Sequence, residues 1–592
     1  MNLEILPNEL FLKLFDYLTI LDVFQAFENL NFRFQSLILI YCRDIRLNFQ
    51  GISKTNFDII CRKYLPIFAK QIRSLQLAND DDTPQQIPLF ISYGFHLQNF
   101  TYLQTLSLSH IHSSYLLDKL LTECSHLSFL TNLSIINCHV SINQSTAEHL
   151  YNQIWSLPNL IQCYFDIHSP NRNHFPTPTI VSKSMKSLSI PNISCYSNPL
   201  ILLLQSTPNL EYLSITYIDY IDQYNMPLPV LSVTRLKLSF DCSLNILKYL
   251  LQSLPNLCHL TLDTCNLYMN GYQWEELITT YLPHLETFRF KMRFSPTLDT
   301  EKEVQMNEIL NSFRTKFWIE EHQWFVRCHW YASNEQYRLD FIDLFTLPYM
   351  FKEFLSYTGC ILAKSTCASD DCFWSYDQVN QLCYGSSHFT SSIMSRLRFS
   401  NIEHLSLSLP YNEQFLLVIP KLDRLVSLFV SINNHKDTSS IPSQLQLLLD
   451  RAKCLTTLSF GSWGSTSLGM LFTNIVNRTI RKLNFQGYIC GKNWRCFDEK
   501  QCLDLIHSPL GVQCETLLIK VKNRICIYNL VKEMQRLQAL NVRCENDRWT
   551  QENSLSSSAR DDLIEWLKEC VPRSCVITRD TYRIGDIRLW IR

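Results

Sequence analysis

Glycine is scarce in this sequence and supplies only 12 of its 592 residues. A phosphate-binding loop needs several glycines beside a lysine. The one glycine-rich stretch, residues 461–469, contains no lysine. The His-Glu-x-x-His pattern of zinc proteases is also absent, and no Ser, His and Asp residues stand at a spacing that singles out a nucleophile and its base. The sequence therefore predicts a protein that is not an enzyme and needs no cofactor.

An excess of charge of either sign is missing as well. Lys plus Arg number 53 and Asp plus Glu number 54, so the formal net charge is −1. A near-neutral chain has no general attraction for nucleic acid or for an anionic membrane, so neither is expected as a partner. No uncharged apolar run approaches the roughly 18 residues of a membrane-spanning helix. Glu4, Glu9 and Lys13 interrupt the first 20 residues, which argues against a secretory leader.

Cysteine, by contrast, is plentiful, with 23 residues. Without a leader, these thiols are expected to be reduced and to pack as small apolar groups in a cytoplasmic or nuclear protein. Structural zinc sites use closely spaced cysteine pairs, and Cys367 with Cys372 comes nearest to one. No full set of ligands accompanies this pair, so no metal site is predicted.

Residues 1–45 have the pattern of three short helices. Pro7 suits a helix start, and Leu10, Leu14 and Leu18 recur every four residues. Two further apolar segments follow, around residues 22–27 and 31–40. So small a unit has little core of its own and usually packs against a partner or against the rest of its chain.

The residues of this segment resemble an F-box: Leu6-Pro7-x-Glu9-Leu10, Phe15-x-x-Leu18, Asp22-Val23 and Leu30-Asn31-x-Arg33-Phe34. In two places the sequence departs from the family, which often has Val-Cys where Leu30-Asn31 stands and Trp where Phe34 stands. The resemblance implies that a Skp-type adaptor, and through it a cullin, binds this segment. It also implies a set of residues that contact the adaptor or support the contact surface: Leu6, Pro7, Leu10, Leu14, Phe15 and Leu18. The alternative is a helical cap, which any repeat array needs.

One six-residue pattern, apolar-x-x-apolar-x-apolar, recurs through most of the remaining chain. About fifteen copies begin at Ile72, Leu103, Leu130, Leu160, Met185, Leu210, Val233, Leu257, Leu285, Ile402, Leu425, Leu455, Ile480, Cys514 and Leu537. The last two apolar positions alternate with polar ones, which predicts a short strand with one buried face. Helical segments lie between the strands, for example residues 147–154 and 244–251.

This repeat resembles the leucine-rich repeats of the ribonuclease-inhibitor class. The resemblance implies an α/β fold in which parallel strands line the concave face of a solenoid and helices cover the convex face. The predicted organisation is an all-α F-box at 1–45, a first part of the solenoid at 46–294, an interruption at 295–400, and a second part with a C-terminal cap at 401–592. The cap is expected to contain a helix through residues 563–567 and final strands near 576–577 and 587–591.

The interruption is rich in aromatic residues and does not keep the repeat pattern. Residues 323–331 and 337–345 look like two strands of a hairpin. One hypothesis is an insertion that projects from the solenoid and binds a partner through its aromatic side chains: Trp318, Trp324, Phe325, Trp330 and Tyr331. The other is a pair of degenerate repeats in which the same side chains form core.

Basic residues gather on three successive predicted strands: Arg235, Lys237, His259, Arg289 and Lys291. At polar positions of the strands they should point to the concave face, where arginine could bind an acidic or phosphorylated segment. The alternative is a set of solvated charges. Together with the F-box resemblance, this pattern suggests a non-catalytic substrate receptor of a Skp–cullin–F-box ubiquitin ligase that acts on an unknown protein substrate. Two alternatives remain, a repeat scaffold without a ligase role and an enzyme with a site in 295–400.

Overall fold

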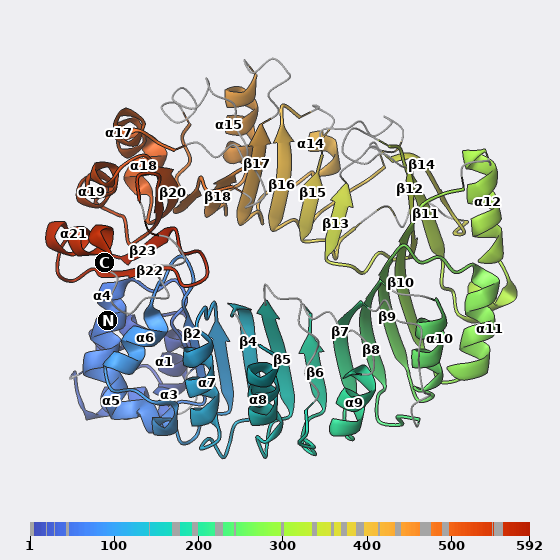
Figure 1. The fold of residues 1–592 in the computed structure, drawn as a ribbon, viewed down its shortest axis with the longest axis horizontal. Helices are drawn as coiled ribbons and strands as arrows, with labels where there is room; N and C mark the ends of the chain where they lie inside the picture. Colours follow the sequence, from blue (N-terminus) through green and yellow to red (C-terminus); the bar gives the residue numbers. More distant parts are fainter. Residues whose placement is uncertain are drawn as a thin grey trace. The chain divides into compact units, whose positions relative to one another are not determined.

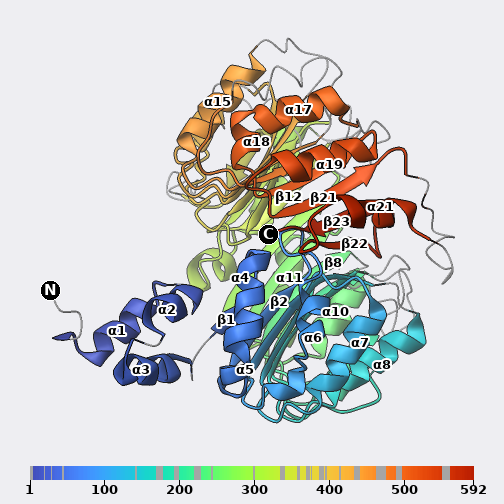
Figure 2. The same ribbon diagram turned by 90° about the vertical axis from the view of Figure 1, so that its left-hand side faces the viewer.

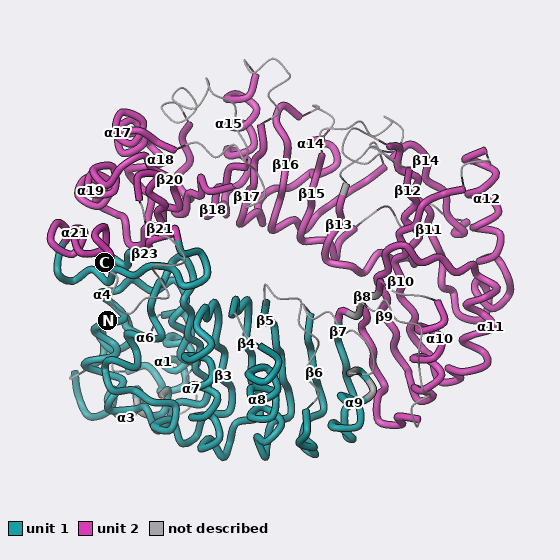
Figure 3. Tube along the Cα trace, in the orientation of Figure 1, with its two compact units in different colours: residues 1–215, 572–584, 588–592 teal, residues 216–571, 585–587 magenta. Residues whose placement is uncertain are grey.

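The computed structural model of this chain forms two compact units (Figure 3). Unit 1 comprises residues 1–215, 572–584 and 588–592, and unit 2 comprises residues 216–571 and 585–587. The structure describes residues 5–18, 20–28, 30–42, 46–140, 143–168, 178–191, 199–218, 229–241, 244–297, 301–333, 340–356, 360–368, 374, 376–385, 393, 396–411, 415–432, 440–461, 475–487, 496–547, 549 and 560–592.

Unit 1 begins with three helices, α1 (Asn8–Phe15), α2 (Ile20–Phe27) and α3 (Phe32–Cys42), which lie together beside the repeats (Figure 2). A parallel ribbon of strands follows: β1 (Arg46–Asn48), β2 (Ser74–Ala78), β3 (Thr105–Ser109), β4 (Asn132–His139), β5 (Gln162–His168), β6 (Ser187–Ile190) and β7 (Tyr212–Ile218). The helices between them are α4 (Lys54–Ile59), α5 (Leu65–Phe68), α6 (Gln86–Ser92), α7 (Ser114–Cys124), α8 (Gln144–Trp155) and α9 (Pro199–Ser206). Helices α7 to α9 cover one side of the ribbon (Figure 1).

The register of this ribbon follows the repeat pattern. Leu75 pairs with Leu106, and Leu106 with Leu133, so the buried leucines of successive repeats form rows. Between the strands, one carbonyl per repeat accepts two backbone N–H groups: Thr131 O accepts from Ile161 N at 2.8 Å and from Gln162 N at 2.9 Å. Each repeat therefore satisfies its backbone and buries its apolar face only by stacking on the next. The predicted strands are confirmed, and β1 adds an earlier repeat that the pattern had not revealed.

Unit 2 contains two sheets. In the first, β8 (Arg235–Asp241), β9 (His259–Cys265) and β10 (Thr287–Phe294) are parallel, and then β12 (Phe341–Thr346), β11 (Val326–Tyr331) and β14 (Cys360–Ser365) continue the sheet antiparallel. In the second, the strands are all parallel: β13 (Glu353–Ser356), β15 (Gln381–Tyr384), β16 (His404–Leu409), β17 (Ser427–Ile432), β18 (Thr457–Phe460), β19 (Lys482–Asn484), β20 (Thr516–Val521) and β21 (Ala539–Cys544).

The helices of unit 2 lie between its strands. They are α10 (Leu244–Gln252), α11 (Gly271–Tyr281), α12 (Lys302–Ser312), α14 (Phe415–Val418), α15 (Ile441–Arg451), α17 (Glu499–His507), α18 (Pro509–Gln513), α19 (Arg524–Glu533) and α21 (Asp562–Cys570). Short polar residues fix several helix starts. Asn270 and Gln273 form a reciprocal capping box at α11, and Asp498 with Gln501 does the same at α17.

The interruption at 295–400 contains the predicted hairpin and also degenerate repeats. The hairpin exists, because β11 and β12 pair antiparallel, although the segment 334–339 that joins them lies outside the described residues. Residues 353–384 then supply two more parallel strands, β13 and β15. The signal for β15 was Val379-x-x-Leu382-x-Tyr384, which has the repeat spacing and is buried at all three positions.

The last part of the chain returns to unit 1. The predicted final strands are confirmed as β22 (Val576–Arg579) and β23 (Asp586–Trp590), and the predicted helix as α21. Residues 554–558, expected to form a loop before this helix, lie outside the described part of the chain. The packing of residues 572–584 and 588–592 on the first repeats had no signal in the sequence.

Candidate functional site: an apolar helix face and a basic strand patch

The three N-terminal helices pack around a small aromatic core. Phe11 and Phe15 of α1 are fully buried. The ring of Phe11 packs edge-on against Phe34 of α3 at 4.9 Å, and Phe15 packs against Phe27 of α2 at 5.0 Å. The Tyr41 hydroxyl donates to the Phe15 carbonyl at 3.0 Å. Phe15, one of the predicted adaptor-binding residues, therefore supports the surface from inside and cannot contact a partner.

Arg33 holds the start of α1 in place. Its Nε donates to Asn8 Oδ1 at 2.8 Å, and its Nη2 donates to the carbonyl of Leu6. Its guanidinium also lies 5.5 Å from the centre of the Phe11 ring. Both Arg33 and Phe34 thus hold the Leu6-Pro7 segment in place. Arg33 binds the backbone of this segment, and Phe34 packs beneath α1, the helix that follows it.

The opposite face of this module is apolar and exposed, and we call it the α1 face. Leu6, Leu10 and Leu14 keep 39%, 49% and 41% of their surface exposed, Pro7 is exposed, and Leu18 is half-buried. Further exposed apolar residues of the same module were not predicted to bind the adaptor: Ile5, Tyr17, Leu30, Phe32 and Ile40. Only Phe32 and Ile40 lie within a helix, α3, so helical periodicity gives no signal for the other three. So much exposed apolar surface on a small module is typical of a protein-binding site.

The predicted basic residues of unit 2 come together on neighbouring strands. Arg235 lies opposite His259, and both Lys237 and Arg289 lie opposite Thr261. Arg235 and Lys237 are exposed, and His259 and Arg289 are half-buried. Leu236 and Leu238, which alternate with them, are buried. We call Arg235, Lys237, His259 and Arg289 the basic patch.

Two further basic residues nearby are held by carboxylates. Lys291 Nζ lies 3.3 Å from Asp263 Oδ2 and 5.8 Å from the centre of the Phe351 ring, and its side chain is only 12% exposed. Arg293 donates twice to Asp343, at 2.7 and 2.8 Å. Burial lowers the pKa of the Arg293 guanidinium, but its hydrogen bonds to Asp343 and the charge of that carboxylate raise the pKa above its ordinary value. Lys291, a predicted substrate-binding residue, is therefore part of a structural ion pair.

The aromatic side chains of the interruption form core. Trp318, Trp330 and Tyr331 are at most 2% exposed, so these three cannot anchor a partner, whereas Trp324 and Phe325 are half-buried. Arg327 and His329 of β11 are fully buried as well, and the Arg327 guanidinium stacks on Trp374 at 4.0 Å. Burial lowers the pKa of His329 well below its ordinary value. None of these groups is accessible to a substrate.

Within the described ranges, no three His, Cys, Asp or Glu side chains are placed to hold a metal ion; Cys372 lies outside them. Nor does any helix of the described residues have the length and apolarity to cross a membrane.

Comparisons with known proteins assign no family to this chain. No family model and no curated protein matches the chain. Among solved structures, the TLR13–ssRNA13 complex is 13% identical over 78% of this chain, with a TM-score of 0.21. The leucine-rich-repeat ectodomain of the plant receptor kinase GASSHO1/SCHENGEN3 from Arabidopsis thaliana, in complex with CASPARIAN STRIP INTEGRITY FACTOR 2, is 12% identical over 76% of this chain, with a TM-score of 0.18. This chain spans 60% and 45% of the lengths of those two chains.

Strand register decides the class of the fold. In each unit, parallel strands carry the repeat pattern in rows, and buried leucines face the helices. Both units are leucine-rich-repeat solenoids. A leucine-rich-repeat solenoid offers long strand-lined surfaces that suit protein interaction.

Proposed function

We propose that this leucine-rich-repeat protein is the substrate receptor of a Skp–cullin–F-box ubiquitin ligase in the cytoplasm or nucleus. One observation carries the proposal: the segment that resembles an F-box presents an exposed apolar face on α1, with Leu6, Leu10 and Leu14 at its centre. A helical cap of a solenoid would instead bury that face against the repeats. The chain itself performs no bond chemistry. It raises the local concentration of a substrate near a conjugating enzyme that other subunits bring.

The first test is a pull-down of the full chain with a purified Skp-type adaptor. We expect Leu10→Glu/Leu14→Glu to lower the affinity for the adaptor at least about tenfold, because two charges would be buried in an apolar interface. The matched control is Leu417→Glu/Leu447→Glu, at positions that are 59% and 47% exposed on helices of unit 2. It should bind like the unaltered chain. Failure of the unaltered chain to bind the adaptor would make the protein a repeat scaffold without a ligase role.

The basic patch is the candidate surface for a substrate. Its four side chains lie on strands β8, β9 and β10, on the face opposite the buried leucines. A cationic patch on a rigid sheet suits an acidic or phosphorylated segment, since guanidinium groups bind carboxylate and phosphate in pairs of hydrogen bonds.

Charge reversal tests this surface. We expect Lys237→Glu/Arg289→Glu to weaken the binding of a polyglutamate or phosphoserine peptide at least about tenfold, measured by fluorescence anisotropy at low salt. The control Arg314→Glu/Lys316→Glu makes the same change of charge at exposed positions elsewhere in unit 2. Equal loss in both variants would show that only net charge matters and would remove the patch from the proposal.

A further inference from the structure

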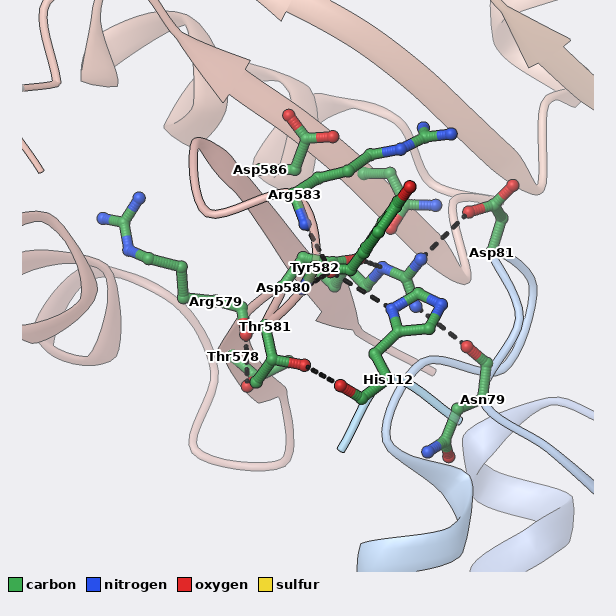
Figure 4. A network of polar contacts seen from close by, with 12 residues as sticks. Asn79, Asp81, His112, Thr578, Arg579, Asp580, Thr581, Tyr582, Arg583 and Asp586 are labelled. Atoms are coloured by element: carbon green, nitrogen blue, oxygen red, sulfur yellow. Dashed lines mark hydrogen bonds and ion pairs between the residues drawn. The ribbon is translucent and has the colours of Figure 1, made fainter. Parts of the chain in front are cut away.

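Residues 572–584 and 588–592 pack on the first repeats of unit 1, and we call them the latch. In Figure 4, Asp580, Thr581 and Tyr582 of the turn between β22 and β23 lie beside His112. Asp580 Oδ1 is 3.1 Å from His112 Nδ1, and the Thr581 hydroxyl donates to the His112 carbonyl at 3.0 Å. Arg588 donates to the carbonyl of Asn79 at 2.8 Å. The latch is thus bound to the segments that follow β2 and β3.

The latch also completes the apolar core of these repeats. Trp590 is fully buried, and its ring packs against Phe57 of α4 with centroids 5.3 Å apart. At its end, the carbonyl of Arg592 accepts a hydrogen bond from Lys54 N at 2.6 Å. Release of the latch would therefore expose a tryptophan and open an edge of the first repeats.

Four histidines from three successive repeats form a row, and the latch turn contacts two of them, His112 and His139. His110 and His112 follow β3, His139 ends β4, and His168 ends β5. The ring of His139 stacks on His168 at 4.6 Å with an interplanar angle of 15°, and Tyr582 of the latch covers it at 4.7 Å. His112 meets His139 edge-on at 5.7 Å. The latch closes over this row and removes much of it from water.

Two of the four imidazoles are poorly placed to carry a proton. The Nδ1 atoms of His110 and His139 are buried without a hydrogen-bond partner among the described residues. Burial and, to a smaller extent, the neighbouring His168, His112, Arg583 and His110 together lower the pKa of His139 to about 4. Burial also lowers the pKa of His110, against the opposing charges of Asp80 and Asp81.

We propose that the latch is a pH-sensitive device, docked while His110 and His139 are neutral and released when acidification protonates them. Tyr582 and Arg583 belong to the latch, so undocking returns His139 to water and removes a positive neighbour. The undocked state therefore binds protons more tightly than the docked state. This difference in proton affinity favours release of the latch as the pH falls.

Charged groups of both signs lie on the elements around the row. The carboxylates are Asp80 and Asp81 after β2, Asp166 of β5 and Asp580 of the latch. Asp580 contacts His112 at 3.1 Å and Arg588 at 2.8 Å, and Asp166 lies 3.4 Å from His168, so these two carboxylates act on the other histidines of the row. Asp80 and Asp81 favour a protonated His110 and Arg588 opposes it, whereas Arg583 opposes a protonated His139.

The sign of the pH effect follows from these shifts. The pKa of His139 is about 4 in the docked state and near the ordinary value of about 6.5 when undocked. Docking is therefore fully favoured above about pH 6.5 and weakens as the pH falls from 6.5 toward 4. Hydrogen bonds and the charge of Arg588 hold the pKa of Asp580 well below its usual range despite its burial, so that carboxylate adds to the loss only at still lower pH.

Hydrogen exchange of the full chain at pH 7.5 and pH 5.0, corrected for intrinsic rates, tests the proposal. His139 alone would shift the docking equilibrium about 30-fold at pH 5, and its partial exposure reduces this. We expect the protection factors of residues 572–592 to fall at least about tenfold, while those of β16 to β18 in unit 2 stay constant. Equal protection of the latch at both pH values would overturn the proposal.

A variant without the titrating group separates this effect from general acid instability. His139→Phe keeps an aromatic ring between His168 and Tyr582, and its latch should lose less than about threefold of its protection at pH 5. The control His126→Phe, at an exposed position of the same unit, should keep the full pH dependence. Should the phenylalanine variant fold poorly, His139→Gln gives the same readout. If the variant that folds kept the full pH dependence, a group other than His139 would be responsible, and the proposal of a pH-sensitive latch would be refuted.

Discussion

Replacement of Arg588 by methionine is expected to lower the free energy of unfolding of unit 1 by about 3 kcal/mol. The Arg588 side chain is 11% exposed and pairs with Asp580 at 2.8 Å, and its guanidinium also lies 3.6 Å from Asp81. Methionine fills similar space but leaves the buried carboxylate of Asp580 with His112 as its partner. Removal of one member of a buried pair costs more than the pair contributes, because the other charge remains desolvated.

Lys186→Met is the matched control in the same unit. Lys186 pairs with Glu211 at 2.8 Å, but both side chains are about half exposed. Loss of an exposed ion pair of this kind should cost at most about 1 kcal/mol. The readout is urea-dependent hydrogen exchange of β2 and β3 peptides. A loss in Arg588→Met no larger than in Lys186→Met would mean that the latch does not stabilise the first repeats.

Gly271→Ala is expected to destabilise unit 2 by about 3 kcal/mol, although alanine normally favours a helix. A Cβ on Gly271, the first residue of α11, would lie 2.1 Å from the carbonyl oxygen of Ser312 and 2.7 Å from Phe313 N. These are backbone atoms, so rotation of a side chain cannot relieve the clash. The Gly271 N–H also donates to Ser312 Oγ at 2.8 Å, and its carbonyl accepts from Trp318 Nε1 at 3.1 Å.

The same helix provides the control for this second prediction. Thr280→Ala lies at an exposed position of α11 and should change stability by less than about 0.5 kcal/mol. Hydrogen exchange of α11 and α12 measures both variants. If Gly271→Ala matched the control, the close approach between the end of α12 and the start of α11 would have to be wrong.

The repeat strands could be predicted from the sequence because each uses a local rule. Leu236 and Leu238 are buried while Arg235 and Lys237 are not, and this alternation is visible within four residues. Strands β11 and β12 were harder, since β11 is buried on both faces and shows no alternation. The pairing of β12 with β10 had no signal at all, because β12 continues a parallel sheet in the opposite direction.

The candidate sites were predictable in part for the same reason. The α1 face follows from a four-residue period on one helix. The basic patch follows from strand register, but its true extent depends on Asp263 and Asp343, which neutralise Lys291 and Arg293. Asp343 is 50 residues from Arg293 in the sequence, and no local pattern connects them. The latch is the extreme case, because its contacts join residues 468 and 509 positions apart.

Those long separations have a consequence for biosynthesis. A ribosome adds about 5–20 residues per second, so residues 580–592 emerge roughly 20–100 s after the repeats they cover. During that interval, Phe57 and the segment after β2 lack the side chains of Trp590 and Arg588. Most solenoids can consolidate repeat by repeat from one end. In this chain the first repeats are completed only after residues near 590 have been made, and a nascent chain would present an unfinished apolar edge to chaperones until translation has passed Trp590.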